Sequence, residues 1–161
     1  MKNHLTRFYS NSAFTILIVL WSMLTSFKGD GCVSEQMNKE AVSKLKKYSL
    51  IENYPFYMKK KKKKDVPETK KVIVTLNNGM RYKFFSIKNP DYEGIPILTI
   101  YNNEKMEFMV ASTYNANMNK FYNDMEFECK TTGNYCLVFS FFEGEEGCGL
   151  GIYSLLASAS K

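Results

Sequence analysis

Histidine is almost missing from this chain of 161 residues, because the single imidazole is that of His4. A Ser–His–Asp or Cys–His centre needs an imidazole as its base, so the sequence beyond the N-terminal segment excludes both kinds of nucleophilic catalysis. It also excludes histidine-containing zinc sites. No glycine-rich phosphate loop precedes a helix. We therefore expect no catalytic residue, no cofactor and no metal site, and expect that the chain is not an enzyme.

Cysteine is scarce as well, and its spacing favours disulfides over a zinc site. None of Cys32, Cys129, Cys136 and Cys148 forms a Cys-x-x-Cys pair. Four cysteines allow three pairings, and the sequence alone does not choose among them. We favour Cys32–Cys148, which would tie a helix to the last strand, together with Cys129–Cys136, which flank a tight turn and can face each other across a hairpin.

The first thirty-one residues have the order of a secretory signal peptide. A short basic stretch, Met1 to Arg7, precedes the uncharged apolar run Ala13 to Phe27, and small and polar residues follow up to Gly31. This order predicts a signal peptide over residues 1–31 and a secreted or periplasmic protein. Export would place the cysteines in an oxidising compartment, where disulfides form.

Two other fates of this segment stay open. An uncleaved membrane anchor is one, although the apolar run is shorter than the roughly 20 residues that cross a bilayer as a helix. Lipidation of Cys32 is the other, since a small residue, Gly31, precedes it as in bacterial lipoproteins. Lipidation would leave Cys148 without its favoured partner.

Residues 32–161 are enough for one domain with a single core. We predict a helix over residues 34–48, with Ser34 as its N-cap. Its apolar stripe should pack on a larger element; the stripe consists of Met37, Ala41, Val42 and Leu45.

Beyond residue 71 the sequence predicts about seven short strands separated by turn signals. Val72 to Leu76 alternates apolar residues, and Asn77-Asn78-Gly79 is the strongest hairpin signal in the chain. Pro55 argues against a central strand at Ile51 to Met58. Helices do not alternate with strands, which excludes a parallel α/β sheet. The expected fold is therefore mainly β, an antiparallel jelly-roll-like β-sandwich with one N-terminal helix.

An unbroken lysine run carries most of the positive charge. Six like charges repel one another and cannot be buried, so we expect an exposed loop; the run consists of Lys59, Lys60, Lys61, Lys62, Lys63 and Lys64. The run is either simply solvated or a contact for an anionic surface such as a membrane. Export argues against a nucleic-acid partner.

Two further motifs invite a chemical interpretation. The acidic group Glu143, Glu145 and Glu146 is typical of a solvated hairpin tip, and the alternatives are a calcium site or a pair of carboxylates acting on a sugar. The glycine-rich stretch Gly147 to Gly151 opens a strand, so it indicates a bulge or a close backbone approach more than phosphate binding.

The stretch Phe127 to Ile152 resembles the C-terminal hairpins of small exported jelly-roll-like sandwiches. It also resembles uncharacterised secreted proteins of Bacteroidota-type bacteria that end in a Gly-Cys strand. The resemblance covers about a fifth of the chain. It implies a fold and no activity, so it assigns no functional residue.

Together these patterns indicate a secreted or periplasmic protein that acts by binding or by associating with the cell envelope. Its partner would be a protein, a glycan or an envelope component. The alternative is an accessory protein tethered to the membrane by Cys32 or by an uncleaved leader.

Overall fold

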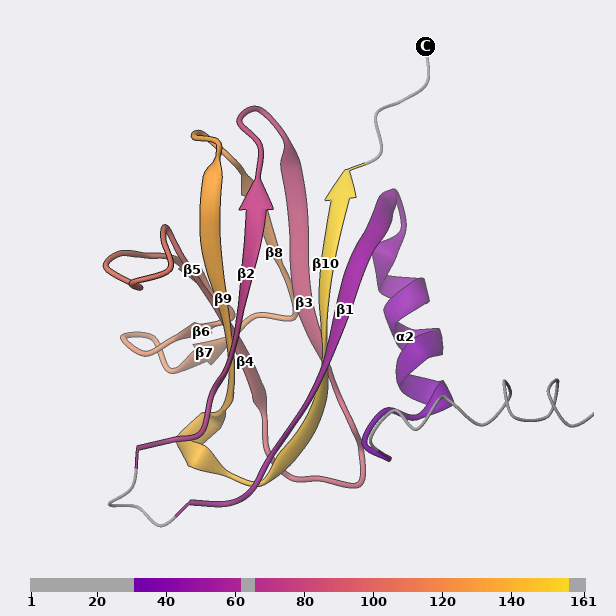
Figure 1. Cartoon of the computed structure of the whole chain (residues 1–161). Coiled ribbons are helices and arrows are strands. Elements are labelled where there is room, and N and C mark those ends of the chain that lie inside the picture. The colour runs from indigo at the N-terminus through magenta and orange to yellow at the C-terminus, as the bar shows by residue number, and fades with distance from the viewer. Residues whose placement is uncertain (1–30, 62–65, 157–161) are drawn as a thin grey trace, which may run out of the picture. The chain divides into compact units, whose positions relative to one another are not determined.

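Antiparallel strands dominate the computed structural model, which describes residues 31–61 and 66–156 (Figure 1). These residues form a β-sandwich with one α-helix against one of its two sheets, so the predicted fold class is confirmed. The predicted signal peptide lies outside the described residues apart from Gly31. Lys62, Lys63 and Lys64 of the lysine run lie outside them as well.

The helix α2 spans Glu35–Leu45 and is shorter than predicted. Its N-cap is the predicted Ser34, whose hydroxyl oxygen accepts a hydrogen bond from the backbone N–H of Met37 at 3.3 Å. The helix ends before Lys46, which adopts a positive φ of 52°. Val42 was predicted to lie on the packed stripe, but its side chain is 70% exposed because the buried face is narrower than the stripe.

Two four-stranded sheets form the sandwich. We call the sheet with order β1-β10-β3-β8 the first sheet and that with order β2-β9-β4-β5 the second sheet; a small hairpin, β6-β7, follows β5. The bounds are β1 Tyr48–Met58, β2 Lys70–Leu76, β3 Arg81–Lys88, β4 Pro96–Tyr101, β5 Met109–Ser112, β6 Tyr114–Asn115, β7 Lys120–Phe121, β8 Met125–Glu128, β9 Gly133–Phe141 and β10 Gly147–Leu156.

The strands pair in the jelly-roll manner, in which early strands meet late ones. β1 pairs with β10, β2 with β9 and β3 with β8, all antiparallel. The described residues contain ten strands where we predicted about seven. The predicted hairpin at Asn77-Asn78-Gly79 is wrong in one respect: the chain does turn there, but β2 and β3 belong to opposite sheets. Residues such as Asn-Gly determine that the chain reverses direction. They do not determine which strand pairs with which.

The sequence does not predict a strand at β1, because the segment contains Pro55. The structure places this strand at the edge of the first sheet, where it pairs with β10 alone. An edge strand tolerates proline, since its outer side has no ladder of hydrogen bonds to lose. The prediction that Ile51 to Met58 is not a central strand is therefore confirmed, although the segment is a strand.

Alternating glycines of β10 make room for aromatic rings in the core. A Cβ atom on Gly149 would lie 2.4 Å from the ring of Phe56, and one on Gly151 would lie 2.1 Å from the ring of Phe139. Gly147 meets Phe141 in the same way. The predicted close approach along Gly147 to Gly151 is thus confirmed, with side-chain rings as the approaching groups.

Candidate interaction surface

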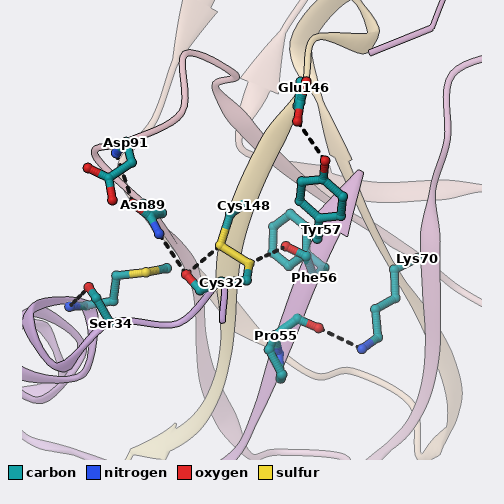
Figure 2. Close-up of a disulfide and its surroundings, with 11 residues drawn as sticks. Cys32, Ser34, Pro55, Phe56, Tyr57, Lys70, Asn89, Asp91, Glu146 and Cys148 are labelled. Carbon is teal, nitrogen blue, oxygen red and sulfur yellow. Dashed lines mark hydrogen bonds between the residues drawn. A yellow bond between two sulfur atoms is a disulfide. The ribbon is translucent and has the colours of Figure 1, made fainter. Parts of the chain in front are cut away.

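The outer face of the first sheet is covered by α2 and closed by a disulfide. Met37 and Ala41 of the helix pack on Phe85, Leu150 and Ile152 of that sheet. The predicted Cys32–Cys148 bond forms where the chain enters the helix (Figure 2). Asn89 supports this junction, because its side-chain amide donates to the carbonyl oxygen of Cys32 at 2.7 Å.

The second predicted disulfide, Cys129–Cys136, is wrong, because both thiols are free and buried. Cys129 follows β8 and points into the core, where its sulfur lies 3.6 Å from the hydroxyl oxygen of Tyr135. Successive residues of a strand point to opposite faces, so Cys136 points to the outer face of the second sheet. The two sulfur atoms therefore lie on opposite sides of one sheet.

The lysine run begins beside the acidic turn that follows β9. The ammonium group of Lys60 pairs with a carboxylate oxygen of Glu145 at 2.8 Å, and the backbone N–H of Lys61 donates to the carbonyl oxygen of Gly144 at 3.2 Å. The Glu145 carboxylate raises the pKa of Lys60. The sequence predicted an exposed lysine loop and a solvated acidic tip but did not bring them together.

Tyr57 adds a third link to this acidic turn. Its hydroxyl donates to a carboxylate oxygen of Glu146 at 2.6 Å, and this hydrogen bond raises the pKa of Tyr57 to about 12 (Figure 2). Glu143 and Glu146 are both exposed. Within residues 31–61 and 66–156, no group of three or more His, Cys, Asp or Glu side chains is arranged to hold a metal ion. The contacts of the acidic turn therefore join it to Tyr57, Lys60 and Lys61, at the end of β1 and the start of the lysine run.

A polar groove of about 700 Å³ lies between the loop that follows β4 and the loop that precedes β9. Its side chains mostly bond to one another. Asn134 accepts from the hydroxyl of Thr75 and donates to Glu104, while the side-chain oxygen of Asn103 accepts from the backbone N–H of Glu107. These groups hold the loops in place and leave few free partners for a ligand.

The outer face of the second sheet carries an apolar row that crosses all four strands. Ile73 of β2 lies opposite Cys136 of β9, Cys136 lies opposite Tyr101 of β4, and Tyr101 lies opposite Met109 of β5. Cross-strand partners point to the same face, so these four side chains are neighbours. We call Ile73, Cys136, Tyr101 and Met109 the outer row.

This row is open to solvent at both of its ends. Ile73 is 44% exposed and Met109 is 63% exposed, and Phe108, just before β5, is 68% exposed. The helix α2 packs on β1, β3 and β10, so within the described part of the chain no α-helix covers the second sheet. Between the two ends Tyr101 is half-buried and Cys136 is buried, so the exposed apolar side chains are Ile73 at one end and Phe108 and Met109 at the other. Exposed apolar patches on a folded domain mark interaction sites.

The comparisons with known proteins leave the outer row as the main guide to function. No family model and no curated protein matches this sequence. None of the helices in the described segments is long and apolar enough to cross a membrane.

Sequence reasoning missed the outer row, although one signal for it was present. The alternation in β2 puts Val72, Val74 and Leu76 on the core side, which leaves Ile73 as a large apolar residue on the solvent side. The row emerges only when the strand order and register place Tyr101 and Met109 on the same line.

Proposed function

We propose that this chain is an exported, non-enzymatic binding protein that contacts a protein partner through the outer row. The observation that carries the proposal is the unequal covering of the two sheets. One outer face is covered by α2, whereas the other presents Ile73, Tyr101 and Met109 to solvent. The jelly-roll fold by itself supports no particular activity.

The chemistry of the outer row favours a protein over a glycan as the partner. The centres of protein interfaces are enriched in tyrosine, phenylalanine and methionine and poor in charge. The row contains one aromatic ring, that of Tyr101, and three aliphatic or sulfur-containing side chains. Phe108 and Val110 extend it at β5. Such a surface suits apolar side chains of a protein better than the hydroxyl groups of a sugar.

Export is supported by the leader pattern of residues 1–31 and by the buried disulfide, because structural disulfides persist in oxidising compartments.

The disulfide also argues against one form of the membrane-tethered alternative. A Cys32 sulfur bonded to Cys148 has no free thiol to carry a lipid, so the disulfide disfavours lipidation. An uncleaved leader is the remaining form of that alternative. The intact mass of the protein from its own cells separates the two, because only cleavage removes the mass of the leader.

The binding role is tested by comparing two exposed aliphatic residues on opposite faces. Ile73→Lys places a charge in the outer row, and Val42→Lys is its matched control on α2. We expect chemical cross-linking in intact cells to give a partner adduct with the wild type and with the Val42→Lys variant but not with the Ile73→Lys variant. Equal adducts from all three proteins would contradict the proposal.

A further inference from the structure

One lysine of the first sheet is almost fully buried. Lys83 of β3 is 6% exposed, and its ammonium group pairs with a carboxylate oxygen of Asp124, just before β8, at 3.0 Å. In the other ion pairs of the described residues, the basic side chain is between 32% and 76% exposed. Burying a charged group carries a desolvation cost that an ion pair offsets only in part. The environment of Lys83 therefore favours a neutral form of this side chain.

Aromatic rings and a carbonyl group enclose the Lys83 ammonium group. Its nitrogen lies 5.7 Å from the ring centres of both Tyr48 and Phe85, and it donates to the carbonyl oxygen of Lys44, near the end of α2, at 3.2 Å. These contacts hold the nitrogen against the Asp124 carboxylate. Reacting groups fixed in contact behave as if present at about 10⁵–10⁸ M, so an amine held this way is placed to attack the carboxyl carbon.

A second carboxylate lies beside the pair. Glu126 of β8 is the cross-strand partner of Lys83, so the two side chains are neighbours on the outer face of the first sheet. Glu126 also lies close to Tyr48, because burial and the Glu126 carboxylate raise the pKa of Tyr48 to about 12. The Tyr48 ring itself faces the Lys83 nitrogen. Glu126 is therefore in position to accept a proton from Lys83.

We propose that Lys83 and Asp124 form an isopeptide bond, which is an amide between side chains, with Glu126 as the proton carrier. Glu126 moves one proton from the Lys83 ammonium group to the Asp124 carboxylate. The neutral amine then attacks the carboxyl carbon, a C–N bond forms and the C–OH bond breaks. The hydroxyl leaves with a second hydrogen of the amine as water. One ammonium and one carboxylate thus become one amide and one water, and no group is oxidised or reduced.

The bond joins β3 to the segment that enters β8. The strand β8 lies at the edge of the first sheet and pairs with β3 alone, so the bond fastens this edge covalently. The side chain of Asp124 is 39% exposed, which gives the released water a way out. The inference goes beyond the proposed binding function, because it concerns the first sheet and needs no partner.

The test is mass spectrometry of the intact protein and of its tryptic peptides, after the cysteines are reduced and alkylated. We expect the chain to be lighter than its sequence by the mass of one water. Trypsin does not cleave after an acylated lysine, so residues 82–88 should stay whole and joined to residues 121–130. The pair of Lys60 and Glu145 is the internal control. Its two groups are equally close, but the Lys60 side chain is 65% exposed, so no bond should form there.

Two variants separate the roles of the residues. Lys83→Arg keeps the positive charge but has no amine to form this amide, so it should keep the full mass. Glu126→Gln keeps the size of an exposed side chain and removes the proton carrier, so most of this variant should keep the full mass as well.

A wild type of full mass that trypsin cleaves after Lys83 would overturn the proposal. Loss of water that persists in Lys83→Arg would overturn it too, and an unchanged yield in Glu126→Gln would overturn the role of Glu126. The partner adduct from the outer row is measured independently of these masses, so the isopeptide bond and the binding function fail separately.

Discussion

Individual glycines determine how closely the two sheets approach. The core of the sandwich is rich in aromatic residues, and the ring centre of Phe56 lies 5.0 Å from that of Phe139 and 5.2 Å from that of Phe141. Their rings occupy the space in which side chains of β10 would otherwise project. Glycine is required at these positions by packing and not by backbone conformation, because their φ angles are not in the left-handed region.

A methyl group at one of these glycines should therefore destabilise the fold. Gly151→Ala would put a Cβ atom 2.1 Å from the ring of Phe139, and such overpacking costs about 1–3 kcal/mol. Gly133→Ala is the control, since no atom lies within 4 Å of its Cβ position and its φ is not positive. Urea denaturation measures both free energies of unfolding. Equal losses in the two variants would contradict the packing argument.

The free thiols give a second prediction at this scale. Burial raises the pKa of the Cys136 thiol, and both Cys129 and Cys136 are almost inaccessible. Because the thiolate is the reactive form, neither should react with a thiol reagent in the native protein. We expect two reactive thiols in denaturant without reductant and four after reduction. A count of zero in denaturant would show that a second disulfide exists.

Among the secondary-structure elements, α2 depends on its attachment to the sheet. A helix of eleven residues is marginal by itself, so it owes its stability to the packing of Met37 and Ala41 and to the disulfide behind its N-cap. The cap at Ser34 was predictable because it involves neighbours in sequence. The exposed position of Val42 was not, because it depends on how far the helix overlaps the sheet.

The disulfide should contribute a large part of the stability. It joins residues 116 positions apart, and in the chain-entropy model a loop of about that length stabilises the native state by about 4–5 kcal/mol. We expect the double variant Cys32→Ala, Cys148→Ala to lose that amount in urea denaturation. Reduced wild-type protein should unfold at the same urea concentration as the variant. A loss below about 1 kcal/mol would contradict the prediction.

At the scale of the whole molecule, strand pairing is what the sequence did not determine. Alternation located β2 because it depends on neighbouring residues. A jelly roll pairs strands that are far apart in the chain, so local turn signals misled us at Asn77-Asn78-Gly79 and at the turn between Cys129 and Cys136. Both errors have one cause, which is that consecutive strands lie in opposite sheets.

The same long-range pairing creates the candidate binding surface. The outer row contains one residue from each strand of the second sheet, and these residues are neighbours only in the register that the structure shows.

The lysine run is the most conspicuous charged segment in the sequence. In the structure, Lys60 near its start forms an ion pair with Glu145. A contact of this run with an anionic surface stays a prediction.

Site-specific photo-cross-linking in living cells tests the binding account most directly. A photoreactive residue is introduced at Ile73 in the outer row or at Val42 on α2, and the adducts are compared after irradiation. We predict a discrete adduct with one partner protein from position 73 and none from position 42. Adducts from position 42 alone, or from neither position, would contradict the claim that the outer face of the second sheet is the binding surface.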